Sequence, residues 1–87
     1  MRNDERIWVQ TEISDIYLAS SLVCSGHQMR DTEFESFDRA IFVFESTPEL
    51  QKCVSDYWDG LLRIEPRQFA NTIRDIKARA RAYKARD

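Results

Sequence analysis

The chain has 87 residues, a formal net charge of −2 and a hydrophobic share of 43%. This length suits a single small domain, residues 1–87, and the supply of branched and aromatic residues excludes a disordered chain. No apolar run approaches the roughly 20 residues that span a bilayer, and the charged start lacks the apolar stretch of a signal peptide. Two cysteines, Cys24 and Cys53, are too few for a secreted disulfide scaffold. We therefore expect a cytoplasmic protein that has no membrane contact.

The charge is distributed unevenly along the chain. Residues 1–62 contain 5 Lys/Arg and 12 Asp/Glu, a balance of −7, whereas residues 63–87 contain 8 and 3, a balance of +5. The isoelectric point of the whole chain therefore says little about its partners. The contrast between an acidic N-terminal part and a basic C-terminal part is the property that calls for an explanation.

A short strand and a helix are predicted first. In residues 6–11 β-branched and aromatic side chains alternate, which favours a strand with Ile7, Val9 and Thr11 on one face. Ser14 is the expected N-cap of the helix that follows. Gly26 is expected to end this helix, because glycine takes a left-handed conformation without a Cβ penalty.

A hairpin is predicted in the middle of the chain. Residues 27–34 form a mostly polar segment typical of an edge strand, residues 35–38 form the turn, and residues 39–45 are the strongest strand in the sequence. Phe42 and Phe44 share one face of this last strand. We expect them in the core, in preference to an exposed platform on which nucleic-acid bases stack.

The next helix has a sharp start with two alternative caps. Either Ser46 caps it in a capping box with Glu49, or Thr47 caps it with Pro48 in the first helical position. An apolar stripe at helical spacing follows, and Cys53 and Trp58 are expected to widen it. Gly60 is expected to end the helix.

Pro66 opens a last, amphipathic helix, predicted over residues 66–85. Its apolar side chains fall within an arc of about 80° at 100° per residue. They are Phe69, Ile73, Ile76, Ala80 and Tyr83. The element order β-α-β-β-α-α predicts an α+β fold, in which a small sheet of about three strands packs against three helices.

Basic side chains gather on one flank of this helix, beside the apolar stripe. They are Arg67, Arg74, Lys77, Arg81 and Lys84. Five cations without an acid among them favour binding to phosphates or another polyanion. Two alternatives remain: an ordinary solvated face whose cations complement the helix dipole, or docking against acidic residues of the same chain or a second copy. On the other flank, Asp75 is placed to pair with Arg79.

The residues that carry chemistry are few. Cys24 and His27 have a spacing that suits two zinc ligands, with Cys53 as a third, but no second closely spaced pair completes a site. The cysteines are better interpreted as small apolar residues on helix faces. With one histidine, two glycines and no phosphate-binding loop, we expect no enzyme activity, no metal and no cofactor.

Several short segments together form a recognisable pattern. They are Tyr17-Leu18-Ala19, Phe42-Val43-Phe44-Glu45, Pro48-Glu49-Leu50, Tyr57-Trp58-Asp59-Gly60-Leu61, Pro66-Arg67-Gln68-Phe69 and Arg74-Asp75-Ile76-Lys77-Ala78-Arg79. The pattern resembles a family of small prokaryotic and phage proteins known as a domain of unknown function, over about residues 7–80. The family implies no activity, cofactor or catalytic residue. It favours Asp before the proline, where this chain has Glu65, whose longer side chain is expected to cap the helix less well.

These observations favour a non-catalytic binding module that binds DNA or RNA through the basic helix. The occurrence that the resemblance implies on mobile elements agrees with a nucleic-acid or host-interaction role. The alternative is a protein-interaction module, such as a phage or mobile-element adaptor or inhibitor, or a subunit of a larger assembly. An exposed Trp58 or Trp8 beside an apolar patch would favour the alternative. Self-association through the last helix is a version of the same hypothesis.

Overall fold

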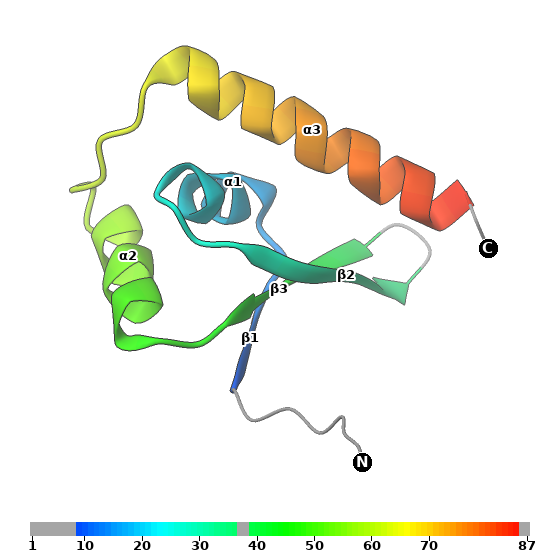
Figure 1. Cartoon of the computed structure of the whole chain (residues 1–87), viewed down its shortest axis with the longest axis horizontal. Coiled ribbons are helices and arrows are strands. Elements are labelled where there is room, and N and C mark those ends of the chain that lie inside the picture. Colours follow the sequence, from blue (N-terminus) through cyan, green and yellow to red (C-terminus); the bar gives the residue numbers. More distant parts are fainter. Residues whose placement is uncertain (1–8, 37–38, 86–87) are drawn as a thin grey trace.

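The computed structural model describes residues 9–36 and 39–85, without the side chains of Ser36, Lys84 and Ala85. The elements follow the predicted order: β1 (Gln10–Ile13), α1 (Ile16–Cys24), β2 (Met29–Ser36), β3 (Arg39–Glu45), α2 (Pro48–Trp58) and α3 (Pro66–Ala85). The strands form one antiparallel sheet in the order β1-β3-β2, so the fold is α+β, as expected. Figure 1 shows α1 between the sheet and α3, with α2 at one end of the molecule.

The core lies between the sheet and the helices. Phe42 and Phe44 point to the helix side of β3, are 3% and 0% exposed, and pack with Leu18 and Leu22 of α1 and Leu50 of α2. Both phenylalanines are therefore core residues, as predicted, and provide no platform for base stacking. β3 is the central strand, which suits the most apolar run in the sequence because a central strand loses solvent on both edges.

The first strand lies later in the chain than predicted. Residues 6–8 of the predicted strand fall outside the described residues, and Val9 is 72% exposed and precedes β1. The strand continues to Ile13, which pairs with Phe42 and is buried in the core. Because Ile13 is buried against Phe42, the strand extends beyond residue 11, where the predicted strand ended.

The N-caps of the first two helices were predicted with mixed success. Ser14 is not the cap of α1, because the carboxylate of Asp15 accepts the amide hydrogen of Tyr17 at 2.8 Å and the helix begins one residue later. At α2 the second alternative is confirmed. The Thr47 hydroxyl accepts the amide hydrogen of Leu50 at 3.0 Å, with proline in the first helical position.

Glycine ends both α1 and α2, as predicted. Gly26 and Gly60 have φ of +100° and +75°, the left-handed region that other residues avoid. The residue after each glycine closes the helix with a backbone hydrogen bond. The amide of His27 donates to the Leu22 carbonyl at 3.0 Å, and the amide of Leu61 donates to the Asp56 carbonyl at 2.8 Å. Each glycine turns the chain sharply, and the second turn aims the connector toward the start of α3.

β2 is an edge strand, as predicted, but covers Met29–Ser36 in place of residues 27–34. The first two residues of the predicted turn, 35–36, belong to the strand, and residues 37–38 lie outside the described residues. The register of β2 against β3 shifts at two points, so the longer strand follows β3 through local bulges.

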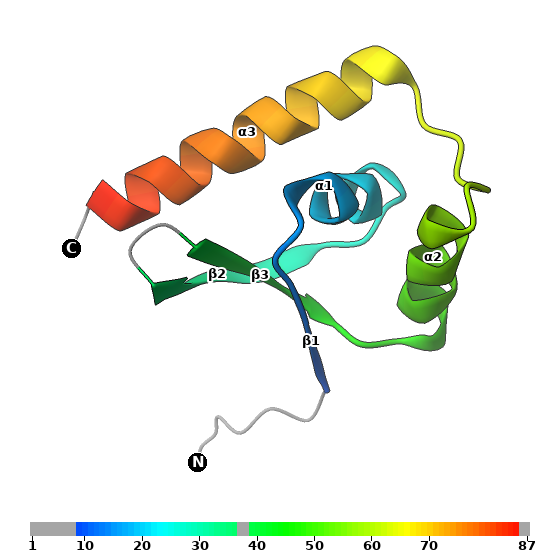
Figure 2. The ribbon, with the colours of Figure 1, turned by 180° about the vertical axis from the view of Figure 1, so that it is seen from behind.

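The other face of the sheet has no helix from the described part of the chain over it (Figures 1 and 2). Ile41 and Val43 of β3 lie on this face, because they alternate with the core phenylalanines. Glu33 lies opposite Ile41 on β2, and Glu12 lies opposite Val43 on β1. The acidic N-terminal part of the sequence thus contributes to a face that points away from the helices.

Candidate nucleic-acid interface

Glu65 caps the basic helix more effectively than the sequence predicted. Its carboxylate accepts the amide hydrogens of Arg67 at 3.1 Å and Gln68 at 2.7 Å. Its own carbonyl accepts the amide hydrogen of Phe69 at 3.0 Å. The longer side chain therefore folds back far enough to satisfy two of the amides that a helix start leaves free, and α3 begins at Pro66 with a complete cap.

α3 is held to the rest of the molecule by an apolar face that packs on α1. Ile76 is buried in the core, whereas Tyr83 at the end of the predicted apolar stripe is 42% exposed. The contacting side of α1 has small side chains, and the thiol of Cys24 lies 3.4 Å from the hydroxyl of Thr72. Small residues let the two helix axes approach closely.

None of the described helices is long and apolar enough to cross a membrane.

The predicted cations lie together on the solvent side of this helix. The structure places four of them, which we call the basic face: Arg67, Arg74, Lys77 and Arg81. All four are exposed, and at 100° per residue they span an arc of about 80°, centred about 140° from the buried Ile76. The fifth, Lys84, belongs to the same helix, but its side chain lies outside the description.

The basic face has no acidic partner among the described residues. The ion pairs among the described residues join Arg30 with Glu45, Arg39 with Glu35 and Lys52 with Asp56, and none of them includes a residue of α3. Arg74 donates a hydrogen bond of 2.7 Å to the side-chain oxygen of Asn71, which is neutral. Apolar contacts with α1 hold α3 in place, and docking of these four cations on acidic residues of the same described chain is not observed.

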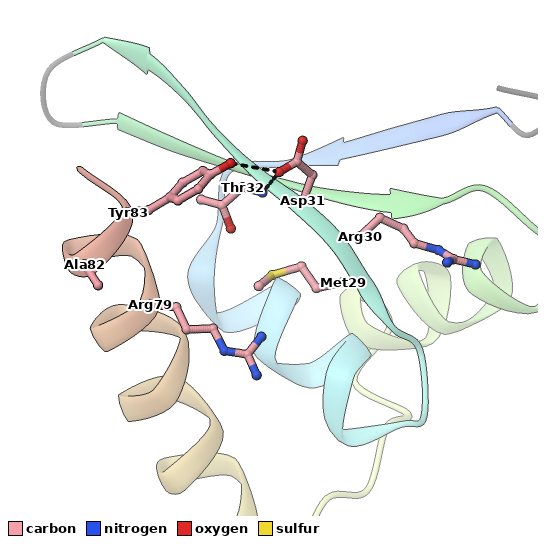
Figure 3. A pocket seen from close by; sticks show the side chains of 7 residues that line it. All are labelled: Met29, Arg30, Asp31, Thr32, Arg79, Ala82 and Tyr83. Atoms are coloured by element: carbon pink, nitrogen blue, oxygen red, sulfur yellow. Dashed lines mark hydrogen bonds between the residues drawn. The ribbon is translucent and has the colours of Figure 1, made fainter. Parts of the chain in front are cut away.

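Asp75 and Arg79 do not form the ion pair that their spacing suggested. Arg79 instead lines a pocket of about 380 Å³ between the end of α3 and the edge strand β2. Figure 3 shows Arg79 and Tyr83 reaching this pocket from the helix, while Arg30 extends away from it. The Arg30 guanidinium bonds Glu45 at 2.9 Å.

This pocket has a mixed charge. The carboxylate of Asp31 lies on its strand side, accepts the amide hydrogen of Thr32 at 2.8 Å and lies 3.5 Å from the hydroxyl of Tyr83. The ring of Tyr83 also lies 6.3 Å from that of Phe34, between centroids. Of the two arginines at this pocket, Arg30 is paired with Glu45 and Arg79 shares the pocket with the carboxylate of Asp31. The pocket therefore favours an anion less than the basic face does. This pocket could not be predicted from the sequence, because its walls are some 50 residues apart in the chain.

The residues considered for zinc do not come together. Among the described residues, no three His, Cys, Asp or Glu side chains are placed to hold a metal ion. Cys53 is buried in the core and Cys24 is half-buried at the contact between α1 and α3, both as free thiols. This agrees with their interpretation as small apolar residues on helix faces.

A second surface carries large apolar side chains that remain in solvent. Trp58 was expected to widen the apolar stripe of α2, but it is 65% exposed, and Leu61 is 61% exposed. Tyr17, at the start of α1, is 53% exposed. The rings of Trp58 and Tyr57 meet edge to face, with centroids 5.0 Å apart. We call Tyr17, Trp58 and Leu61 the aromatic patch.

Comparison with known proteins identifies a family. The model of the family DUF5659, described as a domain of unknown function, matches residues 9–82. The chain therefore belongs to this family, which confirms the resemblance seen in its sequence. No curated protein and no solved structure matches the chain. The chemistry of its surfaces is thus the basis on which a function is inferred.

Proposed function

For this member of the DUF5659 family, we propose that α3 binds nucleic acid through its basic face. One observation carries the proposal: four exposed cations lie on one side of a 20-residue helix, with no acidic side chain among them and no ion pair to the described chain. A cation that is already in an ion pair must break that pair before it binds phosphate. These four cations have no ion pair within the described chain to break.

The spacing of the cations suits a phosphate backbone. Arg67 and Arg81 are 14 residues apart, which at 1.5 Å per residue is about 21 Å along the helix. One strand of a duplex rises by about 3.4 Å per nucleotide along the duplex axis, so the basic face has the axial span of about six nucleotides. Ala70 and Ala78 lie beside the cations on this face and cannot read bases by hydrogen bonds, and the side-chain oxygen of the neighbouring Asn71 already accepts a hydrogen bond from Arg74. The expected binding is therefore weakly dependent on sequence.

The negative charge on the sheet face that has no described helix over it favours one orientation of the molecule toward a polyanion. Glu12 and Glu33 lie on the face opposite the helices, so a polyanion is repelled there and attracted at α3. This separation of charge supports the proposal that a chain with a net charge of −2 binds nucleic acid through one helix.

The test is fluorescence anisotropy with a labelled duplex of about 20 base pairs and a single strand of equal length, at several salt concentrations. The triple variant Arg74→Gln, Lys77→Gln, Arg81→Gln should weaken duplex binding and reduce the slope of log K against log salt by about 3. A control variant, Arg39→Gln, Lys52→Gln, Arg63→Gln, removes the same charge from exposed positions elsewhere and should keep most of the slope. Equal losses in both variants, or no binding at low salt, would contradict the proposal.

A second candidate function is protein interaction at the aromatic patch. It is supported by Trp58, because a tryptophan that is 65% exposed beside an exposed Leu61 is typical of an interaction surface. The two functions use different residues and do not exclude each other.

A further inference from the structure

An apolar pocket adjoins the aromatic patch. It has a volume of about 360 Å³ and lies where α1, the end of α2 and the start of α3 meet. Tyr57, Leu62, Ile64 and Phe69 give it an apolar lining, and all four side chains are half-buried. A pocket of this size and character accommodates one large apolar side chain of a partner.

The residues of the aromatic patch are tied to those of the pocket. Tyr17 lies one turn before Ser21 on α1, and the Ser21 hydroxyl, which belongs to the pocket wall, donates to the Tyr17 carbonyl at 2.8 Å. Trp58 meets the ring of Tyr57 edge to face. Leu61 lies between Gly60 and Leu62, which both line the pocket. The patch and the pocket thus form one surface in which exposed apolar side chains border a recess.

Acidic side chains outnumber basic ones around this surface. Asp15, Asp56, Asp59 and Glu65 lie in the segments that build it, whereas the cations of these segments are Lys52, Arg63 and Arg67, the last of which belongs to the basic face. Lys52 is paired with Asp56 at 3.0 Å, and Arg63 donates to the Gly60 and Leu62 carbonyls at 3.1 and 3.0 Å. Burial, and after it the charge of Asp15, raise the pKa of Tyr57 above its ordinary value. Exposed faces of Tyr17 and Trp58 also attract cations.

We propose that this surface binds a segment of a partner protein that inserts one large apolar side chain into the pocket and places an adjacent Lys or Arg over the aromatic patch. The pocket supplies the apolar anchor site, and the carboxylates and ring faces select the positive charge. The inference rests on the protein-interaction candidate function and is independent of nucleic-acid binding by α3.

The experiment selects short random peptides displayed on phage against the full immobilised chain, with the Trp58→Ser variant for counter-selection. The enriched peptides should share a large apolar residue with Lys or Arg within a few positions. A synthetic peptide of this kind is then titrated against a Trp8→Phe chain, in which Trp58 is the sole tryptophan. Binding should reduce the quenching of Trp58 fluorescence by acrylamide.

Matched variants separate this surface from the basic face. Leu61→Ser should weaken peptide binding about tenfold. Replacing the peptide's cation by alanine should weaken binding to the parent about threefold, but should change binding to the double variant Asp15→Asn, Asp59→Asn little. Arg74→Gln, Lys77→Gln should leave peptide binding unchanged, although it weakens nucleic-acid binding. Trp58 and Leu61 are exposed, so these variants should keep the circular dichroism of the parent.

Three outcomes would overturn the inference. The first is that no peptide is enriched over the Trp58→Ser counter-selection, and the second is that the enriched peptides are acidic or uncharged. The third is self-association in sedimentation that Leu61→Ser abolishes, because the occupant would then be a second copy of the chain. Loss of duplex binding in the Arg74, Lys77 and Arg81 variants has no bearing on any of these results.

Discussion

Ser20 and Ser21 are neighbours in α1 and both are buried, yet only Ser21 has a hydrogen-bond partner: its hydroxyl donates to the Tyr17 carbonyl at 2.8 Å, and the Ser20 hydroxyl has none in the described chain. Burying a hydroxyl without a partner costs about 1–3 kcal/mol, whereas a satisfied one contributes about 1 kcal/mol. The two serines should therefore respond differently to the loss of the hydroxyl.

Ser20→Ala is expected to raise the free energy of unfolding by about 1 kcal/mol, because it removes an unpaired polar atom and alanine is the better helix former. Ser21→Ala gains the same helix propensity but loses a hydrogen bond, so it should be neutral or destabilising. Urea unfolding of the two variants measures the contrast. Equal changes in both would mean that Ser20 has a partner in solution.

Gly60 should be sensitive to substitution for a reason confined to the backbone. Its φ is +75°, and a Cβ built on it would meet no atom within 4 Å. Gly60→Ala is therefore expected to cost about 1–2 kcal/mol from backbone strain alone. Gly60→Asn should cost less, because asparagine tolerates the left-handed conformation. Urea unfolding should rank the parent, Asn and Ala in that order, and an alanine variant as stable as the parent would contradict this account.

The sequence predicted best those elements whose signals are local. Thr47 followed by proline, the glycines at 26 and 60, and the apolar run over 39–45 each determine local structure by the chemistry of a few adjacent residues. The ends of β1 and β2 were misplaced because they depend on pairing with β3, a contact between distant segments. The strand order β1-β3-β2 likewise follows from tertiary contacts that periodicity does not report.

The residues of the basic face could be predicted from the sequence, but the side chains around them could not. Helical spacing alone placed the four described cations on one side of α3, because that helix is regular over its whole length. Whether those cations were paired depended on where the acidic residues lie, and the sheet places Glu12 and Glu33 on the far face. The exposure of Trp58 could not be predicted, since its position on α2 is compatible with the core. Tertiary contacts decide which side of α2 faces the core, and they leave Trp58 65% exposed.

The carboxylate of Glu65 should be important for the start of α3. Glu65→Ala removes the acceptor for the amide hydrogens of Arg67 and Gln68 and is expected to cost about 1 kcal/mol in unfolding free energy. Glu35→Ala is a suitable control, because that residue is also an exposed Glu and makes one long ion pair of 3.7 Å. Urea unfolding and amide hydrogen exchange at residues 67 and 68 give the two readouts. Unchanged exchange in Glu65→Ala would show that the cap is not formed in solution.

The hydroxyl of Tyr57 should make stability depend on pH in the alkaline range. Burial, then the negative charge of Asp15 and the neighbouring Tyr17, raise its pKa above the ordinary tyrosine value of about 10. Because the raised pKa belongs to the folded state, the contribution is fully present below the unfolded pKa and is lost as pH rises through the folded pKa. The free energy of unfolding should therefore fall more steeply in the parent than in Tyr57→Phe at pH values above about 10.

Asp15→Asn separates the two main causes of this shift. Asparagine is as good an N-cap as aspartate, so the variant should keep the bonds to the first amides of α1 while it removes the charge. The pKa of Tyr57 should then move only part of the way back toward the ordinary value, because burial is the larger cause and remains. Tyrosinate absorbance in the near ultraviolet, taken as the difference between each chain and its Tyr57→Phe counterpart, measures the shift. A complete return to the ordinary value would show that the carboxylate, and not burial, dominates at this position.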